Sequence, residues 1–259
     1  MTGLATDTLS LSLGDTHVLD GVSAAFARGR VTAVLGPNGA GKSSLLGCLA
    51  GLIAPDSGTV TLDGVALAAI DRRTRARRIG LLPQSADVHW NIDVSTLVAL
   101  GRFPHRGRWG ETDADRAAVA RAMAATDVTD FADRGVNRLS GGERGRVLLA
   151  RVLAGEPEWL LADEPLASLD PAHQLDVLDR LRYVALAGAG VIVVLHDLNQ
   201  AARVADDILM LRDGRVVAHG TAAEMLTAER IAETYGVGVH IGRTDEGHAF
   251  VIPVRRTSR

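Results

Sequence analysis

Lys42 is the only lysine among the 259 residues, and it lies in the glycine-rich run Gly36-Pro37-Asn38-Gly39-Ala40-Gly41-Lys42-Ser43. The run matches the pattern G-x-x-x-x-G-K-[ST], whose backbone N–H groups turn inward to hold phosphate oxygens. The ammonium of lysine is compact enough to fit between two neighbouring phosphates, whereas the guanidinium of arginine is a wider, planar group. The pattern predicts a nucleoside triphosphate site in which Lys42 contacts the β- and γ-phosphates and Ser43 binds Mg²⁺. The residues expected to contact the nucleotide here are Pro37, Asn38, Gly39, Ala40, Gly41, Lys42, Ser43 and Ser44.

The segments on either side of this run have the patterns that such a site needs. Residues 31–35 are a short apolar run typical of a buried strand, and residues 44–52 are predicted to form an apolar helix. The N-terminus of that helix would face the anion, where its unpaired N–H groups favour negative charge. A chance match to the pattern would lack these flanking elements.

Two adjacent carboxylates, Asp163 and Glu164, follow the apolar run 159–162. Neighbouring residues of a strand point to opposite sides, so the two carboxylates can do different work. One carboxylate can hold the Mg²⁺ shell while the other orients and deprotonates an attacking water. The alternative is a strand that merely ends in polar residues, and it is the weaker explanation beside a phosphate loop.

A second glycine-rich element, Leu139-Ser140-Gly141-Gly142-Glu143, precedes an apolar helix predicted to run to about residue 153. Ser140 offers a hydroxyl at the helix start, and Gly141 and Gly142 let backbone N–H groups approach an anion. One γ-phosphate does not need two such sites from one chain. Two copies facing each other head to tail would use both; an ordinary glycine-rich helix start is the alternative.

Three more polar residues lie at the ends of predicted elements. Gln84 follows one apolar strand, His196 follows another, and Asp170 has the position of a helix cap before Pro171. An amide can bind Mg²⁺ or water, and a neutral imidazole can donate to the γ-phosphate. Gln84 and His196 both end apolar strands as if aimed at the same centre. Read singly, each is also compatible with a polar residue that simply ends a strand.

In this order the residues resemble the ATP-binding subunit of an ATP-binding-cassette (ABC) transporter, over about residues 4–240. The resemblance implies an α/β fold with a RecA-like core, an antiparallel β subdomain and an inserted α-helical subdomain, and ATP and Mg²⁺ as cofactors. It also implies that Ser43, Gln84 and, through water, Asp163 hold Mg²⁺. Glu164 would be the general base, with Lys42, Gln84 and His196 in the same catalytic site, and Asp170 would link the two sites of a homodimer. By resemblance the Walker A loop is 36–43, the Q-loop residue Gln84, the signature 139–143, Walker B 160–163 with Glu164, the D-loop 168–170, and the switch residue His196.

We expect one ABC ATPase domain over residues 1–259. The RecA-like core with its β subdomain is assigned to 1–85 and 156–240, and the helical signature subdomain to 86–155. A C-terminal strand extension is assigned to 241–259. Residues 101–110 lack clear periodicity and are predicted to form a loop.

Softer features resemble the branch of importers for iron siderophores, haem and cobalamin, among them residues 195–203 and Tyr235-Gly236-Val237. The resemblance implies a homodimer beneath two integral membrane permease subunits, served indirectly by a substrate-binding protein. The chain would then lie peripherally at the cytoplasmic face of the inner membrane. Residues 86–110 would receive a permease helix, with Trp90 as an anchor.

One departure from the family concerns the base. Leu13 stands where an aromatic residue usually stacks on adenine, so we expect Leu13, with Val18, to contact the base through less directional apolar packing. Gly145, where glutamine is common, and Leu166, where threonine is frequent, do not touch the expected chemistry.

Composition narrows the alternatives. A net charge of −3 and 3% aromatic residues argue against nucleic acid as a partner. Neither a signal peptide nor an apolar run of about 18–20 residues is present, so we expect a cytosolic chain that reaches a membrane through another protein. The lone Cys48 is expected in the core, and the arginine run 72–78 on a solvated helix face or a partner-binding patch. An exporter ATPase shares every catalytic motif and stays open; a soluble ABC ATPase acting on nucleic acid is the weaker alternative.

Overall fold

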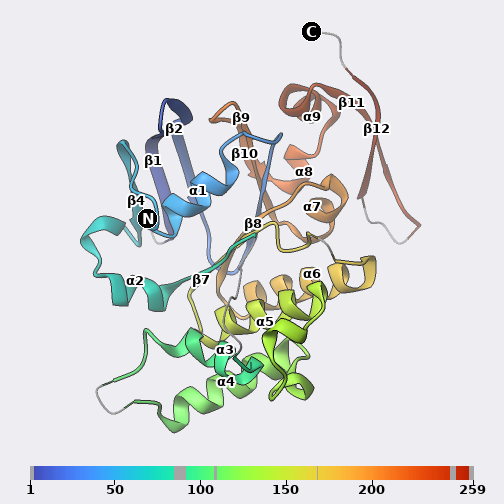
Figure 1. Cartoon of the computed structure of the whole chain (residues 1–259). Helices are drawn as coiled ribbons and strands as arrows, with labels where there is room; N and C mark the ends of the chain where they lie inside the picture. The colour runs from blue at the N-terminus through green and yellow to red at the C-terminus, as the bar shows by residue number, and fades with distance from the viewer. Residues whose placement is uncertain (1–2, 85–91, 108–109, 168, 246–248, 257–259) are drawn as a thin grey trace.

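A six-stranded sheet forms the centre of the computed structural model, which describes residues 3–84, 92–107, 110–167, 169–245 and 249–256 (Figure 1). The strands lie in the order β10-β9-β3-β8-β7-β6, and all neighbours pair in parallel except the edge pair β10 and β9. Their bounds are β3 Val31–Leu35, β6 Ile79–Leu82, β7 Trp159–Asp163, β8 Gly190–Val194, β9 Asp207–Arg212 and β10 Arg215–Thr221.

The central strands are apolar on both faces because both faces are covered. Alternate residues enter different cores: Val34 of β3 packs with the β subdomain, whereas Ala33 packs with the helices on the opposite face. The first core contains Leu9 and Leu45, and the second contains Leu149 and Leu181. The parallel sheet therefore holds its carboxyl ends, where the site residues follow, on a rigid support.

A separate antiparallel sheet covers one face of the central sheet, together with α1 (Lys42–Leu49). Its strands lie in the order β2-β1-β4-β5, with bounds β1 Leu4–Leu13, β2 Thr16–Phe26, β4 Ser57–Leu62 and β5 Val65–Ala66. A short 3₁₀ turn, η1 (Leu67–Ala69), and α2 (Arg72–Arg78) then lead into β6. This sheet is the expected antiparallel β subdomain.

Helices cover the other face and extend below it in Figure 1. Between 94 and 154 the chain forms α3 Val94–Ala99, α4 Asp113–Ala125 and α5 Gly141–Ala154, with short 3₁₀ turns η2 Leu100–Arg102, η3 Thr129–Phe131 and η4 Val136–Arg138. Polar side chains cap these helices: Asp93 caps α3, Thr112 caps α4 and Ser140 caps α5. Below the sheet, α6 (Pro171–Leu186) begins at its expected cap, Asp170.

One buried ion pair fastens the helical insert. Arg102 donates from Nε to Asp115 Oδ1 at 2.8 Å and from Nη1 to the Ala154 carbonyl at 3.0 Å. Both charged side chains of the pair are buried. Arg102 thereby ties η2 to α4 and to the end of α5.

The chain ends in a two-stranded antiparallel hairpin beside the core, β11 (Val237–Arg243) and β12 (Ala249–Arg256). It follows α7 Leu198–Val204, α8 Ala222–Met225 and α9 Ala228–Tyr235. Asn199 of α7 holds the backbone of Val251 in β12 through two hydrogen bonds, of 2.7 and 3.3 Å. Figure 1 shows this hairpin next to α7 and α9.

The α/β fold with a RecA-like core, a β subdomain and an α-helical insert is confirmed. The first helix spans 42–49 rather than the predicted 44–52, because Gly41 caps it in a left-handed conformation and Gly51 (φ 66°) lies beyond its end. The predicted loop 101–110 begins inside the turn η2 because buried Arg102 orders it. The segment limits within the domain stay a prediction, and the described helices include none long and apolar enough to cross a bilayer.

Two other expectations concern single residues and one helix. Cys48 is buried in the core as expected, and burial raises the pKa of its thiol to about 11. None of the α2 residues is buried, yet the Nε atoms of Arg73 and Arg77 donate to the Pro104 carbonyl at 2.7 and 2.8 Å. The arginine run is therefore an exposed helix that also holds a loop of the helical insert. Trp90 and Ser168 lie outside the described residues.

Candidate nucleotide site

The phosphate loop connects β3 to α1 and is shaped by contacts that only glycine permits. A Cβ on Gly36 would lie 2.1 Å from the Leu211 carbonyl oxygen, and one on Gly41 would lie 2.6 Å from the Val18 carbonyl oxygen. Gly41 also has φ of 92°, a left-handed conformation that strains other residues. The glycines thus let neighbouring strands close directly onto the loop.

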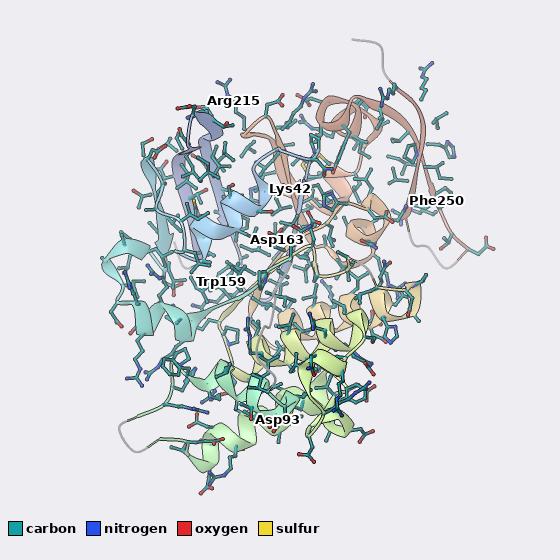
Figure 2. The ribbon with its side chains drawn as sticks, in the orientation of Figure 1. Lys42, Asp93, Trp159, Asp163, Arg215 and Phe250 are labelled. Atoms are coloured by element: carbon teal, nitrogen blue, oxygen red, sulfur yellow. The ribbon has the colours of Figure 1, made fainter. Side chains whose placement is uncertain are left out.

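Lys42 is the first residue of α1 and lies beneath the loop, with 6% of its surface exposed. Its Nζ donates to the carbonyl oxygens of Gly36 at 2.8 Å and Pro37 at 3.0 Å. Burial lowers the pKa of the ammonium, and the nearby carboxylates of Glu164 and Asp163 act in the opposite direction. Figure 2 shows Lys42 and Asp163 at the centre of the molecule.

A cavity of about 650 Å³ opens above the loop. It brings the phosphate loop together with Gln84, Glu164 and His196. Gln84 and His196 are 112 positions apart in the sequence. Its lining residues are Thr16, Val18, Asn38, Gly39, Ala40, Gly41, Lys42, Ser43, Ser44, Gln84, Glu164 and His196.

Glu164 is held at both carboxylate oxygens. Gln84 Nε2 donates to Oε2 at 2.7 Å, and His196 Nε2 lies 2.5 Å from Oε1. The backbone of Glu164 has φ of 49°, a conformation that is uncommon outside glycine and that recurs at functional sites. Gln84, Glu164 and His196, each predicted to follow a strand, therefore form one cluster.

Asp163 has the environment expected of a metal ligand. Its Oδ1 is buried without a hydrogen-bond partner among the described residues, and its carboxylate interacts with the Ser43 hydroxyl. Burial raises the pKa of this carboxyl. An unpaired buried oxygen beside a hydroxyl and close to the Gln84–Glu164 pair fits a hard cation such as Mg²⁺. The described residues hold no cluster of three or more His, Cys, Asp or Glu side chains that could bind a metal by themselves.

The signature residues lie elsewhere. Ser140 accepts from the Glu143 amide at 3.2 Å as the cap of α5, and Ser140, Gly141 and Gly142 are not among the described residues that line the cavity. A Cβ on Gly142 would lie 3.5 Å from Leu169, so the signature borders the D-loop segment. Asp170 accepts from the His173 amide at 3.0 Å as the cap of α6. Within one chain, these residues do not meet the phosphate loop.

Two neighbours of the site were not predicted, and one predicted residue is placed apart from it. Leu13 is 50% exposed and does not line the cavity, whereas Thr16, its partner across the β1–β2 turn, does. Tyr235 reaches the loop from α9, where Gly36 N donates to its hydroxyl at 2.8 Å. Only the position of Tyr235 in the Tyr235-Gly236-Val237 tail could have drawn attention to it.

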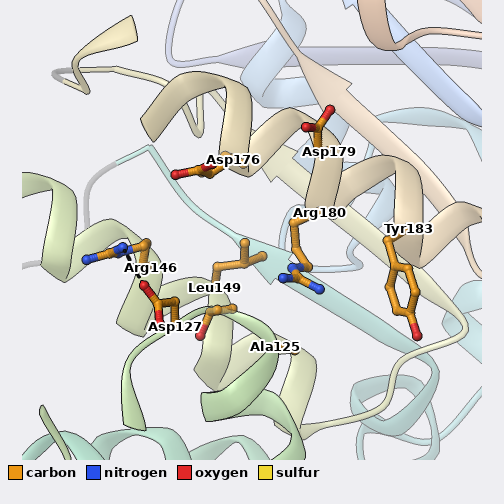
Figure 3. A pocket seen from close by; sticks show the side chains of 10 residues that line it. Ala125, Asp127, Arg146, Leu149, Asp176, Asp179, Arg180 and Tyr183 are labelled. Carbon is orange, nitrogen blue, oxygen red and sulfur yellow. Dashed lines mark hydrogen bonds and ion pairs between the residues drawn. The ribbon is translucent and has the colours of Figure 1, made fainter. Parts of the chain in front are cut away.

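A second cavity, of about 400 Å³, lies where α5 meets α6 (Figure 3). Leu149 and Val177 give it an apolar base, while Arg146 and Asp127 pair at 3.4 Å on one side. No predicted site residue is among the described residues that line it. It marks the joint between the helical insert and the core rather than the nucleotide site.

A phosphate loop between a parallel strand and a helix, with two carboxylates ending a nearby strand, defines a P-loop nucleoside triphosphate-binding domain. Within that class, residues 19–167 match the ABC transporter family, and the chain belongs to it. As an ABC domain it binds ATP.

Three relatives resemble the chain over most of its length. The cobalamin import ATP-binding protein of Halobacterium salinarum is 44% identical over 90% of this chain, which spans 59% of that protein. The hemin import ATP-binding protein of Pseudomonas entomophila is 44% identical over 94% of this chain and 97% of its own length. The ferric enterobactin transport ATP-binding protein of Escherichia coli is 42% identical over 96% and 93%.

Two solved structures share the fold. A chain described as belonging to a metal-chelate type ABC transporter in an inward-facing conformation superimposes with a TM-score of 0.85, 26% identity and coverage of 98% of both chains. A dimeric bacterial ABC transporter cassette superimposes with a TM-score of 0.76 and 26% identity, over 85% of this chain and 98% of its own.

Proposed function

We propose that the chain is the ATP-hydrolysing subunit of an importer that moves an iron chelate across the cytoplasmic membrane. The observation that carries the hydrolytic part of this proposal is Glu164 facing the phosphate-loop cavity with Gln84 and His196 on its two oxygens, while the import part rests on the similar import proteins. This cluster is the arrangement that water activation beside a γ-phosphate requires.

The chemistry follows from the positions of these side chains. Lys42 and the amides of residues 38–43 bind the phosphates; the ammonium then leaves the Gly36 and Pro37 carbonyls for phosphate oxygens. Glu164 removes a proton from a water whose oxygen attacks the γ-phosphorus. The bond from that phosphorus to the β–γ bridging oxygen breaks, which yields ADP and phosphate. His196 is released from Glu164 and donates to the γ-phosphate.

Ser43 and Gln84 would hold Mg²⁺ directly, with Asp163 holding it through water. The ion supplies neutralisation of charge on the β- and γ-phosphates when it is bound with ATP. The unpaired Oδ1 of Asp163 supports this assignment. Val18, which lines the cavity, and Leu13, which pairs with the lining residue Thr16, remain our candidates for contact with the base.

The active unit is proposed to be a head-to-tail homodimer. The signature residues Ser140, Gly141 and Gly142 lie away from their own chain's cavity, so they are available to close the nucleotide of the partner. Asp170 lies close to the signature through Leu169 and is proposed to link the two sites. The dimeric cassette of similar fold supports a dimer as the active unit.

The partners are proposed by similarity. Relatives named for import of hemin, ferric enterobactin and cobalamin point to two integral membrane permease subunits and, indirectly, a substrate-binding protein. The chain would then lie at the cytoplasmic face of the inner membrane. A ferric siderophore is our first candidate substrate, haem the second and cobalamin the third. An exporter remains the alternative, since it would use the same catalytic residues.

The test is reconstitution with the membrane subunits that co-purify with this chain. Vesicles would be assayed for uptake of an ⁵⁵Fe-siderophore, haem and ⁵⁷Co-cobalamin, with ATP supplied on the side of this subunit. ATP-dependent uptake of one compound that stops with Glu164→Gln supports the proposal. ATP-dependent transport of a compound away from the side of this subunit supports the exporter. Co-purification of nucleic acid instead of a permease contradicts both the importer and the exporter.

A further inference from the structure

The C-terminal segment meets the nucleotide site at Tyr235, the last residue of α9. The Tyr235 hydroxyl accepts a hydrogen bond from Gly36 N at 2.8 Å, although the two residues are 199 positions apart. Gly36 is the first residue of the phosphate loop, and its carbonyl oxygen accepts from Lys42 Nζ at 2.8 Å. Gly36 therefore links the Tyr235 phenol of α9 to the ammonium of Lys42.

Gly36 is also fixed from a second side. A Cβ there would lie 2.1 Å from the Leu211 carbonyl oxygen, so β9 packs directly against its α-carbon. With φ of 152°, Gly36 is held between the Leu211 carbonyl and the Tyr235 hydroxyl. The path of the loop out of β3 thus depends on one strand and one side chain.

The last turn of α9 is itself anchored to the end of β9. Thr234 Oγ1 lies 3.3 Å from Met210 Sδ, and Arg212 Nη1 donates to the Glu233 carbonyl at 2.5 Å. Gly236 then ends α9 in a left-handed conformation. Burial raises the pKa of the Tyr235 phenol to about 12, so at neutral pH it accepts the Gly36 N–H as a neutral hydroxyl.

The hairpin that follows is anchored beside the switch residue. Asn199 binds the Val251 backbone at 2.7 and 3.3 Å, and α7, which carries Asn199, begins two residues after His196. The segment from α9 to β12 therefore contacts the core at the phosphate loop and near the switch.

We propose that Tyr235 is a positioning residue for the phosphate loop. Its hydroxyl holds Gly36 in the nucleotide-binding conformation when the Lys42 ammonium leaves the Gly36 carbonyl for the phosphates. This goes beyond the proposed transport function and rests only on ATP binding. Loss of one hydrogen bond at this position changes a binding equilibrium by roughly 2- to 10-fold.

The first test uses the two tyrosines of the chain, Tyr235 and Tyr183. Tyr235→Phe removes the hydroxyl alone, and the matched control Tyr183→Phe removes one from a side chain on α6 that is 63% exposed. We expect Tyr235→Phe to weaken equilibrium binding of Mg·ATP roughly 2- to 10-fold and to raise KM similarly, with kcat within about twofold. The control should match the wild type in all three quantities.

A merely structural role would lower the melting temperature and leave the ATP affinity, measured well below that temperature, unchanged. Wild-type affinity in folded Tyr235→Phe would overturn the proposal while leaving the transport function intact. A wild-type chain that fails to bind ATP would overturn both.

A second measurement covers the case in which Tyr235→Phe does not fold. The full chain labelled with 3-fluorotyrosine gives two ¹⁹F signals, and loss of one in Tyr183→Phe assigns them. We expect ATP to shift the Tyr235 signal and leave the Tyr183 signal in place. A Tyr235 signal that does not respond to saturating ATP overturns the proposal.

Discussion

The imidazole of His196 lies 2.5 Å from the carboxylate of Glu164, and sheet register brings them together. Asp163 of β7 pairs with Val194 of β8, so Glu164 and His196 follow neighbouring parallel strands at the same edge of the sheet. Thirty-two positions separate them in the sequence. Parallel pairing therefore places the proposed base beside the proposed phosphate sensor.

Replacing Glu164 tests the proposed general base. Glu164→Gln keeps the size of the side chain and removes its basicity, so phosphate release should fall about 10²- to 10⁴-fold while ATP binding is retained. Phosphate release and equilibrium ATP binding are the measurements. Glu229→Gln, an exposed glutamate in the first turn of α9, is the control and should behave as wild type. Turnover of Glu164→Gln within about threefold of wild type would rule out the base role.

Ser140 tests the shared site. Ser140→Ala should abolish most hydrolysis and spare ATP binding, because its hydroxyl is proposed to contact the partner's nucleotide. The change also removes a helix cap, which costs about 1 kcal/mol of stability. Thr112→Ala removes the equivalent capping box of α4 and serves as the control for that loss. Equal loss of hydrolysis in both variants would show that Ser140 acts only as a helix cap and does not contact the nucleotide.

Mixed dimers distinguish a composite site from a site within one chain. A chain with Lys42→Ala and a chain with Ser140→Ala are each expected to be inactive alone. In the mixed dimer, one site would combine an intact Lys42 with an intact Ser140, so partial hydrolysis should return on mixing. Phosphate release that stays at the level of the separate variants would refute the head-to-tail arrangement.

Asp115 is predicted to make the unfolding free energy depend on pH in the acid range. The hydrogen-bonded guanidinium of Arg102 holds the pKa of this carboxyl well below its usual range. The ion pair therefore contributes fully above about pH 4, the ordinary aspartate value, and its contribution is lost as pH falls toward the lowered pKa. Asp115→Asn should cost about 1–3 kcal/mol of unfolding free energy at pH 7, because Arg102 loses its buried charged partner and keeps only the carboxylate of Glu156, at 2.8 Å.

Urea unfolding at pH 7 and in acid measures this effect, and the difference from wild type should shrink as pH falls. Asp113→Asn, on the same helix but in a surface pair with Arg116, is the control and should cost less than about 1 kcal/mol. A difference that is constant down to acid pH would contradict the assignment.

Gly190 tests the packing that supports β7 and β8. A Cβ there would lie 2.2 Å from the ring of Trp159, which is fully buried. Gly190→Ala should therefore destabilise the fold by about 1–3 kcal/mol, because a buried indole has no room to shift. Gly107→Ala, where a Cβ meets open space, is the control in the same urea unfolding measurement. Equal stability of the two variants would show that Trp159 can repack.

The local elements were predictable because their signals are local. Asp170 caps α6 as expected from the sequence, since a capping side chain acts on backbone two or three residues away. The apolar runs of β3, β6 and β7 likewise gave the buried strands. The ends of α1 were missed because a left-handed Gly41 and Gly51 determine them, and a sequence does not state φ.

The residue types of the site were also set by the sequence alone: phosphate chemistry needs glycines, a lysine, an amide and carboxylates, and the chain supplies them at 36–42, 84 and 163–164. Tertiary structure decided which of them meet. Strand register placed Gln84 and His196 on the two oxygens of Glu164, and the same fold kept Ser140 away from its own phosphate loop. It also brought Tyr235 onto Gly36 across 199 positions. Contacts of this kind depend on how elements pack in space, and no local pattern of residues encodes that distance.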